Sequence, residues 1–140
     1  MNHSIQPHKS SIGDQPANIM ALISYLIGSV LVFIPGITYL AWLAPLVIFF
    51  LEKESRFVKF HAMQAFVLDA TGILLGLLLT LLFGGLSLRT LALIATLATM
   101  ISLIILGLAI YAMFKAYRYV EYSIPLIGKL SATLTGKINQ

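Results

Sequence analysis

Long apolar runs separated by short polar segments define this chain, and the pattern predicts membrane-spanning helices. The first run extends from Ile19 to Leu51, and two further runs end near Phe83 and Tyr117. Hydrophobic residues make up 59% of the 140 residues and charged residues 10%. A soluble domain carries about 25% charged residues, so the polar groups here are too few to cover a water-facing surface. The length allows one compact bundle and no second domain.

The first apolar run is too long for one span. As a single helix, residues 19–51 would measure about 50 Å, whereas the hydrocarbon core of a bilayer is about 30 Å thick. Pro35-Gly36 lies near the middle and predicts a turn. We therefore expect a hairpin of two short spans, residues 18–34 and 37–53, with a kink at Pro45 in the second. Because each arm is short, Asn18, Glu52 and Lys53 should reach the headgroups.

Two longer spans follow the hairpin. A charged amphipathic segment leads from Ser55 into the third span, residues 55–83, which we expect to end at Gly84-Gly85. The fourth span covers residues 91–117. The predicted fold is therefore all-α: an integral membrane four-helix bundle over residues 17–122.

The two ends of the chain lack long apolar runs. Residues 1–16 are polar and predict a disordered tail, so His3 and His8 are not expected to form a metal site. In residues 123–140 an apolar stripe recurs at helical spacing, at Ile127, Leu130, Leu134 and Ile138. This stripe predicts a short amphipathic helix lying in the membrane interface; a frayed tail is the alternative.

Lysine and arginine residues indicate the orientation of the spans. With four spans, Arg89 alone lies on one side. The other side receives Lys9, Lys53, Arg56, Lys59, Lys115, Arg118, Lys129 and Lys137. This eight-to-one split predicts that both termini are cytoplasmic. A three-span arrangement gives seven against two, so helix length and Pro35-Gly36 decide for four spans.

Composition and motifs exclude several functions. The chain has no cysteine, so disulfides, thiolate metal sites and a cysteine nucleophile are excluded. The net charge of +4 comes from residues that flank the spans rather than from a patch suited to nucleic acid. We find no catalytic motif and expect neither an enzyme nor a cofactor.

Small residues on the third span predict a helix-packing face. Ala62, Ala65, Asp69, Gly72 and Gly76 follow one another at spacings of 3, 4, 3 and 4. Small residues let helix backbones approach closely in a bilayer. Similar stripes occur on the first and fourth spans. Their members are Ala21, Ser24 and Gly28, and Ala95, Thr99, Ser102, Ala109 and Ala116.

Asp69 is the one acidic residue expected inside the membrane. An aspartate at the centre of a span costs about 2.5–3.5 kcal/mol on insertion scales, and such residues usually have a structural or functional reason. Three interpretations stay open. The carboxylate could accept hydrogen bonds from Ser24, Thr38, Thr99 or Ser102, line a wet substrate path, or titrate in a proton cycle.

The segment that leads into the third span carries further candidate residues. Arg56 and Lys59 could bind lipid phosphates, although anchors that extend to the headgroups are the simpler interpretation. We expect His61, on the edge of the packing face, to be a hydrogen-bonded residue near the interface, and Gln64 to point elsewhere.

This segment also resembles a known family signature. Its matching residues are Phe57, Val58, Lys59, Phe60, His61, Met63, Gln64 and Asp69. The pattern is similar to that of the twenty-kilodalton membrane subunit of the plastid inner-envelope protein-import translocon and its bacterial relatives. Residues 21–26 and 121–128 resemble other parts of that family. The resemblance implies four spans, termini on the cytoplasmic or stromal side, and a part in protein translocation.

These observations predict a non-enzymatic scaffold or subunit of a membrane assembly. Its expected partners are the lipid bilayer and either another protein or further copies of the chain. A bacterial inner membrane is the expected location, with the plastid inner envelope as the alternative. The alternative function is a small transporter or channel that handles protons or cations at Asp69. A transporter would normally show a second polar partner in the membrane or an internal repeat, and we find neither.

Overall fold

The computed structural model describes residues 3–31, 34, 36–83 and 87–138 and consists almost entirely of helices. Its elements are β1 (His3–Ser4), α1 (Ala17–Leu31), the 3-10 helix η1 (Thr38–Leu43), α2 (Ala44–Leu51), α3 (Arg56–Phe83), α4 (Leu88–Tyr117), β2 (Val120–Glu121) and α5 (Ile127–Ile138). The all-helical prediction is confirmed in this coarse form. A bundle of four membrane-crossing helices is not established.

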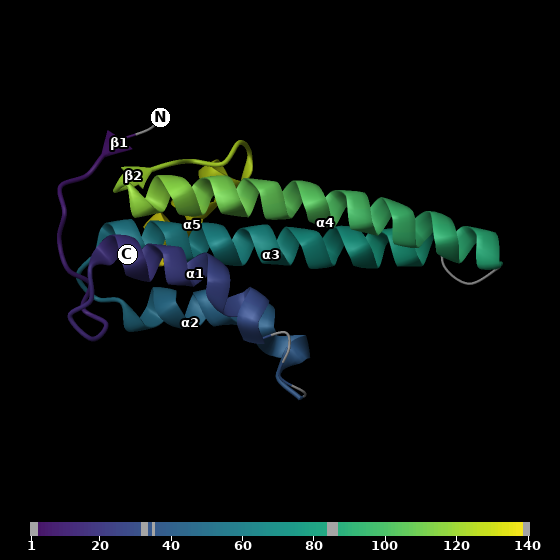
Figure 1. The fold of residues 1–140 in the computed structure, drawn as a ribbon, viewed down its shortest axis with the longest axis horizontal. Helices are drawn as coiled ribbons and strands as arrows, with labels where there is room; N and C mark the ends of the chain where they lie inside the picture. Colours follow the sequence, from purple (N-terminus) through teal and green to yellow (C-terminus); the bar gives the residue numbers. More distant parts are fainter. Residues whose placement is uncertain (1–2, 32–33, 35, 84–86, 139–140) are drawn as a thin grey trace.

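Two of the helices are much longer than the others. With 28 and 30 residues, α3 and α4 are about 42 and 45 Å long, and both are apolar enough to cross a membrane. They lie side by side as a hairpin, and α1 and α2 cover only the half near the chain termini (Figure 1). With 15 residues, α1 is about 22 Å long. The far half of the α3–α4 hairpin is therefore left uncovered.

Local sequence explains where the helices begin. The Ser55 hydroxyl accepts the backbone N–H of Val58 at 3.2 Å, and the Ser87 hydroxyl accepts that of Thr90 at 3.2 Å. These N-cap bonds satisfy donors that a helix start leaves free. Pro45 lies in the first turn of α2, where its missing N–H is not needed. A 3-10 helix ends and an α-helix begins next to Pro45, and the kink expected there stays a prediction.

The predicted turn at residues 35–36 and the predicted end of the third span are only partly visible. Gly36 adopts a positive φ of 86°, a conformation that favours glycine. Pro35, Gly84 and Gly85 lie outside the described residues.

The N-terminal segment is ordered from His3 onward, in contrast to the disordered tail that we expected. Strand β1 pairs antiparallel with β2, and the Ile5 N–H donates to the Tyr119 carbonyl at 2.8 Å. Lys9 and Pro16 form a further bridge within the segment. The difference arises because the backbone and side chains of this segment find hydrogen-bond partners on distant elements. Sequence composition does not reveal such partners.

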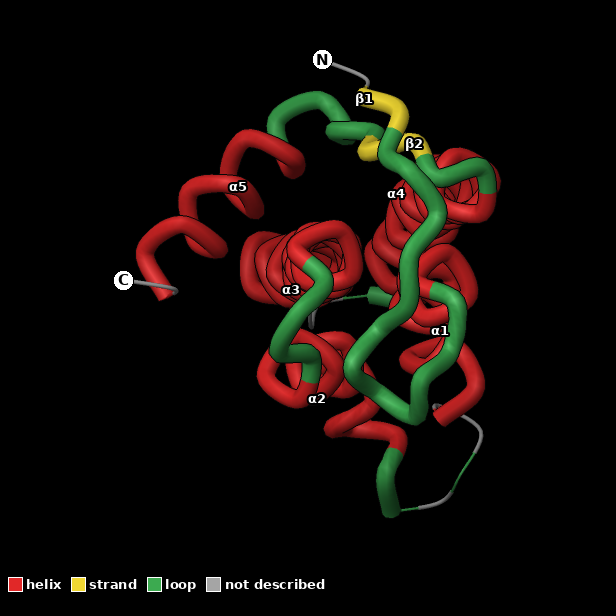
Figure 2. Tube along the Cα trace, turned by 90° about the vertical axis from the view of Figure 1, so that its left-hand side faces the viewer, coloured by secondary structure: helices red, strands yellow, loops and turns green. Residues whose placement is uncertain are grey.

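Helix α5 packs against α3 (Figure 2). Ile127 and Leu134 join the apolar core, and Ser131 and Thr135 are buried beside them. Of the predicted stripe, Ile127 and Leu134 face the core, whereas Leu130 is 51% exposed and lies outside the buried face. The Ser131 hydroxyl can be buried in this contact because it donates a hydrogen bond to the Ile127 carbonyl at 2.8 Å.

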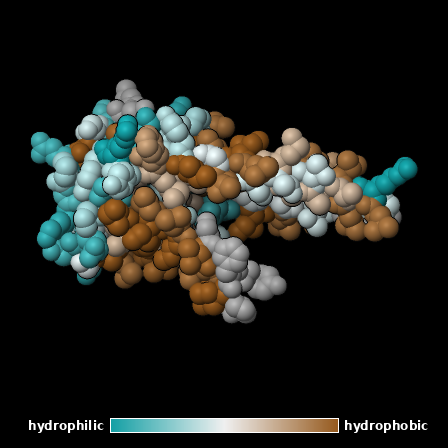
Figure 3. Space-filling view, viewed as in Figure 1, coloured by the Kyte–Doolittle hydropathy of each residue, from teal (hydrophilic) through white to brown (hydrophobic). Residues whose placement is uncertain are grey.

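The apolar core lies at the end of the molecule that holds the chain termini. Its largest fully buried apolar side chains include Phe49, Phe57, Met63 and Leu68. Apolar surface continues along the far half of the hairpin and ends in a small polar tip, whereas the opposite end is broadly polar (Figure 3). This distribution suits a protein surrounded by lipid between two polar ends.

Gly72 and Gly76 share the predicted packing face but have different surroundings. A Cβ atom added at Gly72 would lie 3.1 Å from Cδ1 of Ile105 on α4, whereas one at Gly76 would meet nothing within 4 Å among the described atoms. Overpacking of a well-filled contact costs about 1–3 kcal/mol. We therefore predict that Gly72→Leu lowers the melting temperature in detergent and that the matched Gly76→Leu does not. Equal losses in both variants would contradict this difference.

Candidate functional site

A buried polar cluster joins α1, α3 and the segment after α4. The Tyr25 hydroxyl lies 3.0 Å from Nδ1 of His61, and Nε2 of Gln64 donates to the same hydroxyl at 2.8 Å. Gln64 also donates to the Tyr122 carbonyl at 3.0 Å and accepts the Ile124 N–H at 3.0 Å. All three side chains are buried. Gln64 therefore points into the bundle, toward α1 and the segment after α4.

This network assigns the direction of each hydrogen bond. The Ile124 N–H needs an acceptor, so the Gln64 carbonyl oxygen must face it and the amide nitrogen must face Tyr25. The Tyr25 oxygen then accepts from Gln64, and its hydrogen is directed to Nδ1 of His61. This arrangement requires a neutral imidazole protonated on Nε2.

Aromatic rings enclose His61. The rings of Phe57 and Phe60 contact the imidazole edge-on, with centroids 4.6 and 5.4 Å away. Phe57 also stacks on Tyr119 at 5.8 Å. The signature residues of this segment thus hold α3 to its neighbours. Arg56 is exposed, and the ammonium of Lys59 lies 5.7 Å from the centroid of Phe49.

A second polar cluster surrounds Glu52, which we expected to reach the headgroups. The residue is 1% exposed. It accepts hydrogen bonds from the hydroxyls of Ser10 and Ser11 and from the backbone N–H groups of Ser11, Glu54 and Ser55. Nε2 of His8 lies 2.7 Å from the Ser55 hydroxyl. The cluster fastens the N-terminal segment to the α2–α3 connection.

The Glu52 cluster could be found in the sequence only in part. Ser55 precedes an amphipathic run and is a recognisable N-cap residue. Glu52 stands three residues before it, close enough to accept its N–H. Nothing in the sequence indicated that Ser10 and Ser11 would return to this site, because more than forty residues separate them from Glu52.

Hydrogen bonding controls the charge of Glu52. Burial by itself raises the pKa of a carboxyl, but the bonds from Ser10, Ser55 and Ser11 outweigh this effect and lower the pKa of Glu52 from 4.5 to about 2. A group whose folded-state pKa is depressed stabilises the fold above its ordinary pKa, and this stability is lost as the pH falls through the folded-state pKa. The contribution of Glu52 is therefore complete above about pH 4.5 and disappears toward pH 2.

We predict that Glu52→Gln lowers the free energy of unfolding at pH 7 by about 1–3 kcal/mol, because buried donors lose a charged acceptor. It should also remove part of the stability loss of the wild type between pH 4.5 and pH 2. Thermal unfolding in detergent across this pH range measures both effects. Glu54→Gln is the matched control, since Glu54 is exposed. Identical acid profiles for the wild type and Glu52→Gln would contradict the assignment.

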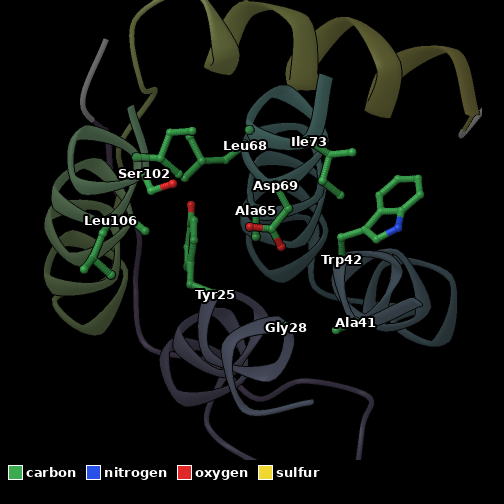
Figure 4. A pocket seen from close by; sticks show the side chains of 13 residues that line it. Tyr25, Gly28, Ala41, Trp42, Ala65, Leu68, Asp69, Ile73, Ser102 and Leu106 are labelled. Atoms are coloured by element: carbon green, nitrogen blue, oxygen red, sulfur yellow. The ribbon is translucent and has the colours of Figure 1, made fainter. Parts of the chain in front are cut away.

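Asp69 lies beside a cavity of about 390 Å³ between α1, η1, α3 and α4 (Figure 4). The expected donors do not reach it: the hydroxyls of Ser24 and Thr99 donate to the carbonyls of Met20 and Ala95 in their own helices. Ser102 lines the same cavity. No hydrogen bond to the Asp69 carboxylate occurs among the described residues, and the side chain of Thr38 lies outside them.

The small-residue face divides into two parts. Ala62 and Ala65 are buried in the two apolar clusters of the core. Gly28 on α1 lies close to Asp69: a Cβ there would lie 3.0 Å from Oδ2 of Asp69 and 3.3 Å from the Ala41 carbonyl oxygen. The face therefore positions the Asp69 carboxylate at the end of α1.

The fold and these clusters define a membrane protein with two long apolar helices and a hydrogen-bonded polar end. The chain belongs to the MamF/MmsF family, described as the magnetosome magnetite crystal formation protein family, which it matches over residues 16–131. This membership corrects our assignment: the resemblance to the plastid import translocon was wrong. The resemblance rested mainly on residues 57–69, several of which serve packing.

Two proteins of the archaeon Methanocaldococcus jannaschii, both named UPF0132 membrane proteins, are similar to the chain. One is 32% identical over 128 residues, which cover 88% of this chain and 91% of the relative. The other is 29% identical over 92 residues, which cover 66% of this chain and 60% of the relative. No solved structure matches the chain.

Proposed function

We propose that this protein is a non-enzymatic membrane component that holds a larger assembly together. The uncovered far half of the α3–α4 hairpin carries this proposal. Its leucines are widely exposed, among them Leu81 at 73% and Leu93 at 64%. The polar end, in contrast, is fastened by the Gln64 and Glu52 clusters. Such a molecule has a polar end held together by hydrogen bonds and two long helices whose far halves can contact lipid and partner helices.

The family name suggests what such an assembly could do. Proteins of this family are named for magnetite crystal formation in magnetosomes. A protein that organises the membrane around a growing mineral needs no catalytic residues of its own. In this chain no acidic residue occurs between positions 70 and 120, and Arg89 is the charged residue near the far end of the hairpin. We therefore propose a role in membrane organisation rather than metal coordination by the far surface.

Photo-crosslinking tests this role. We expect a photoreactive amino acid at Leu81 or Leu93, introduced into the full chain in native membranes, to crosslink to the same membrane protein or to a second copy. Leu68, which is 1% exposed, is the matched control and should give intramolecular products. Crosslinks from Leu81 and Leu93 to lipid alone would contradict a scaffold role.

The membrane arrangement that we propose has four crossings with both termini in the cytoplasm. The chain ends and the α2–α3 connection lie at the same polar end, opposite the α3–α4 connection. The turn between α1 and η1 must reach water, because exposed backbone polar groups are not tolerated in hydrocarbon. Since α1 is about 22 Å long, the two crossings formed by α1 and by η1 with α2 require a locally thinned bilayer.

Single-cysteine labelling tests this arrangement, because the natural chain contains no cysteine. A membrane-impermeant maleimide added outside intact cells should label Ile37→Cys in the turn and Leu88→Cys at the far end. Lys53→Cys, at the polar end, should be labelled only after permeabilisation. Labelling of Leu88→Cys without Ile37→Cys would show that the hairpin ends inside the bilayer and that the chain crosses it twice.

The second candidate function is the handling of cations at Asp69. The cavity beside the Asp69 carboxylate favours this function. A charged residue inside a membrane is costly and usually marks a functional site.

A further inference from the structure

The cavity beside Asp69 has the composition of a binding site for an apolar cation. Its volume of about 390 Å³ lies within the range of about 300–1,000 Å³ that is usual for small-molecule sites. Asp69 is the single formally charged residue among the thirteen that line it, and most of the others are apolar or aromatic. One negative charge in an apolar cavity selects for a ligand with one positive charge and an apolar body.

The surroundings of Asp69 leave its charge uncompensated. Within the described part of the chain no side chain donates a hydrogen bond to this carboxylate, and the ion pair found in that part joins Lys9 to Asp14. The Ala41 carbonyl oxygen and Oδ2 of Asp69 both lie close to Gly28, since a Cβ atom added there would be 3.3 Å from the first and 3.0 Å from the second. Both groups present negative charge, and the described residues supply no cation to an ionised Asp69. A bound cation would be its counterion.

Two aromatic residues flank the carboxylate. Tyr25 from α1 and Trp42 from η1 lie on opposite sides of Asp69 in the close view of the cavity (Figure 4). Trp42 is held by stacking on Phe66, with ring centroids 5.6 Å apart. Aromatic faces attract cations, and most strongly those that have lost water, such as quaternary ammonium groups. This pair therefore favours an organic cation over a hydrated one.

A metal ion is a poorer fit for the same cavity. Hard metal cations require about six oxygen ligands, and the described residues contain no group of three histidine or acidic side chains able to hold a metal. Most of the lining is hydrocarbon, which cannot replace the hydration shell of an inorganic ion. The size and lining of the cavity instead match a small ammonium ion with an aromatic or alkyl substituent.

We propose that the cavity between α1, η1, α3 and α4 binds a lipophilic organic cation, with Asp69 as its counterion and Tyr25 and Trp42 at its sides. This site does not depend on the scaffold role. It gives the second candidate function a chemical class of ligand.

Trp42 provides a direct measurement, because it is the one tryptophan in the sequence. The full chain is reconstituted in liposomes of zwitterionic lipid, so that surface charge does not concentrate the cation and no other tryptophan is present. Benzyltrimethylammonium is the probe, and neopentylbenzene, in which carbon replaces the charged nitrogen, is its neutral counterpart. We expect a saturable change in tryptophan fluorescence with the cation and at least about tenfold weaker binding of the neutral compound.

Three variants separate the charge of Asp69 from its structural effect. Asp69→Asn should weaken binding of the cation by at least about tenfold, whereas Asp69→Glu, which keeps the charge, should retain binding. Asp14→Asn makes the same chemical change at an exposed aspartate in the N-terminal segment and should bind as the wild type does. Melting temperatures establish that each variant is folded. The proposal is overturned if the wild type shows no saturable response, if Asp69→Asn binds as tightly, or if the neutral compound binds equally well.

Discussion

The side-chain amide of Gln64 is the interaction on which the arrangement of this protein depends. It contacts Tyr25, Tyr122 and Ile124, which are 39, 58 and 60 residues away in the sequence. A buried amide is tolerated only where its polar atoms find partners, and here both the oxygen and the nitrogen do. The contact fixes the segment after α4, which carries β2 and leads into α5. The positions of β1 and α5 follow from it.

Glu52 plays the corresponding part on the other side of the polar end. Its carboxylate gathers the N-terminal segment, the end of α2 and the start of α3 around one buried charge. The charge stays ionised because several donors compensate for the loss of water. Asp69 differs in this respect, since no described residue donates to it. One acidic residue therefore serves the fold, and the other is left available to a ligand.

The mistaken family assignment has a physical explanation. Phe57, Phe60, His61 and Gln64 were recognised as a signature, and the structure places them in ring contacts and hydrogen bonds that join helices. Residues that serve helix packing indicate how helices are arranged and do not indicate an activity. The similarity of this segment to translocon subunits therefore carried no information about protein transport.

The sequence by itself determined the apolar character of the chain and the two long helices, because these follow from local composition and spacing. It also identified Asp69, Gly28 and the small residues around them. Only the tertiary structure decided that Gln64 faces inward, that Glu52 is buried, that residues 3–16 are ordered and that Leu130 lies outside the packed face of α5. Each of these outcomes depends on a partner distant in the sequence, and periodicity along one helix does not specify which distant group will satisfy a buried polar atom.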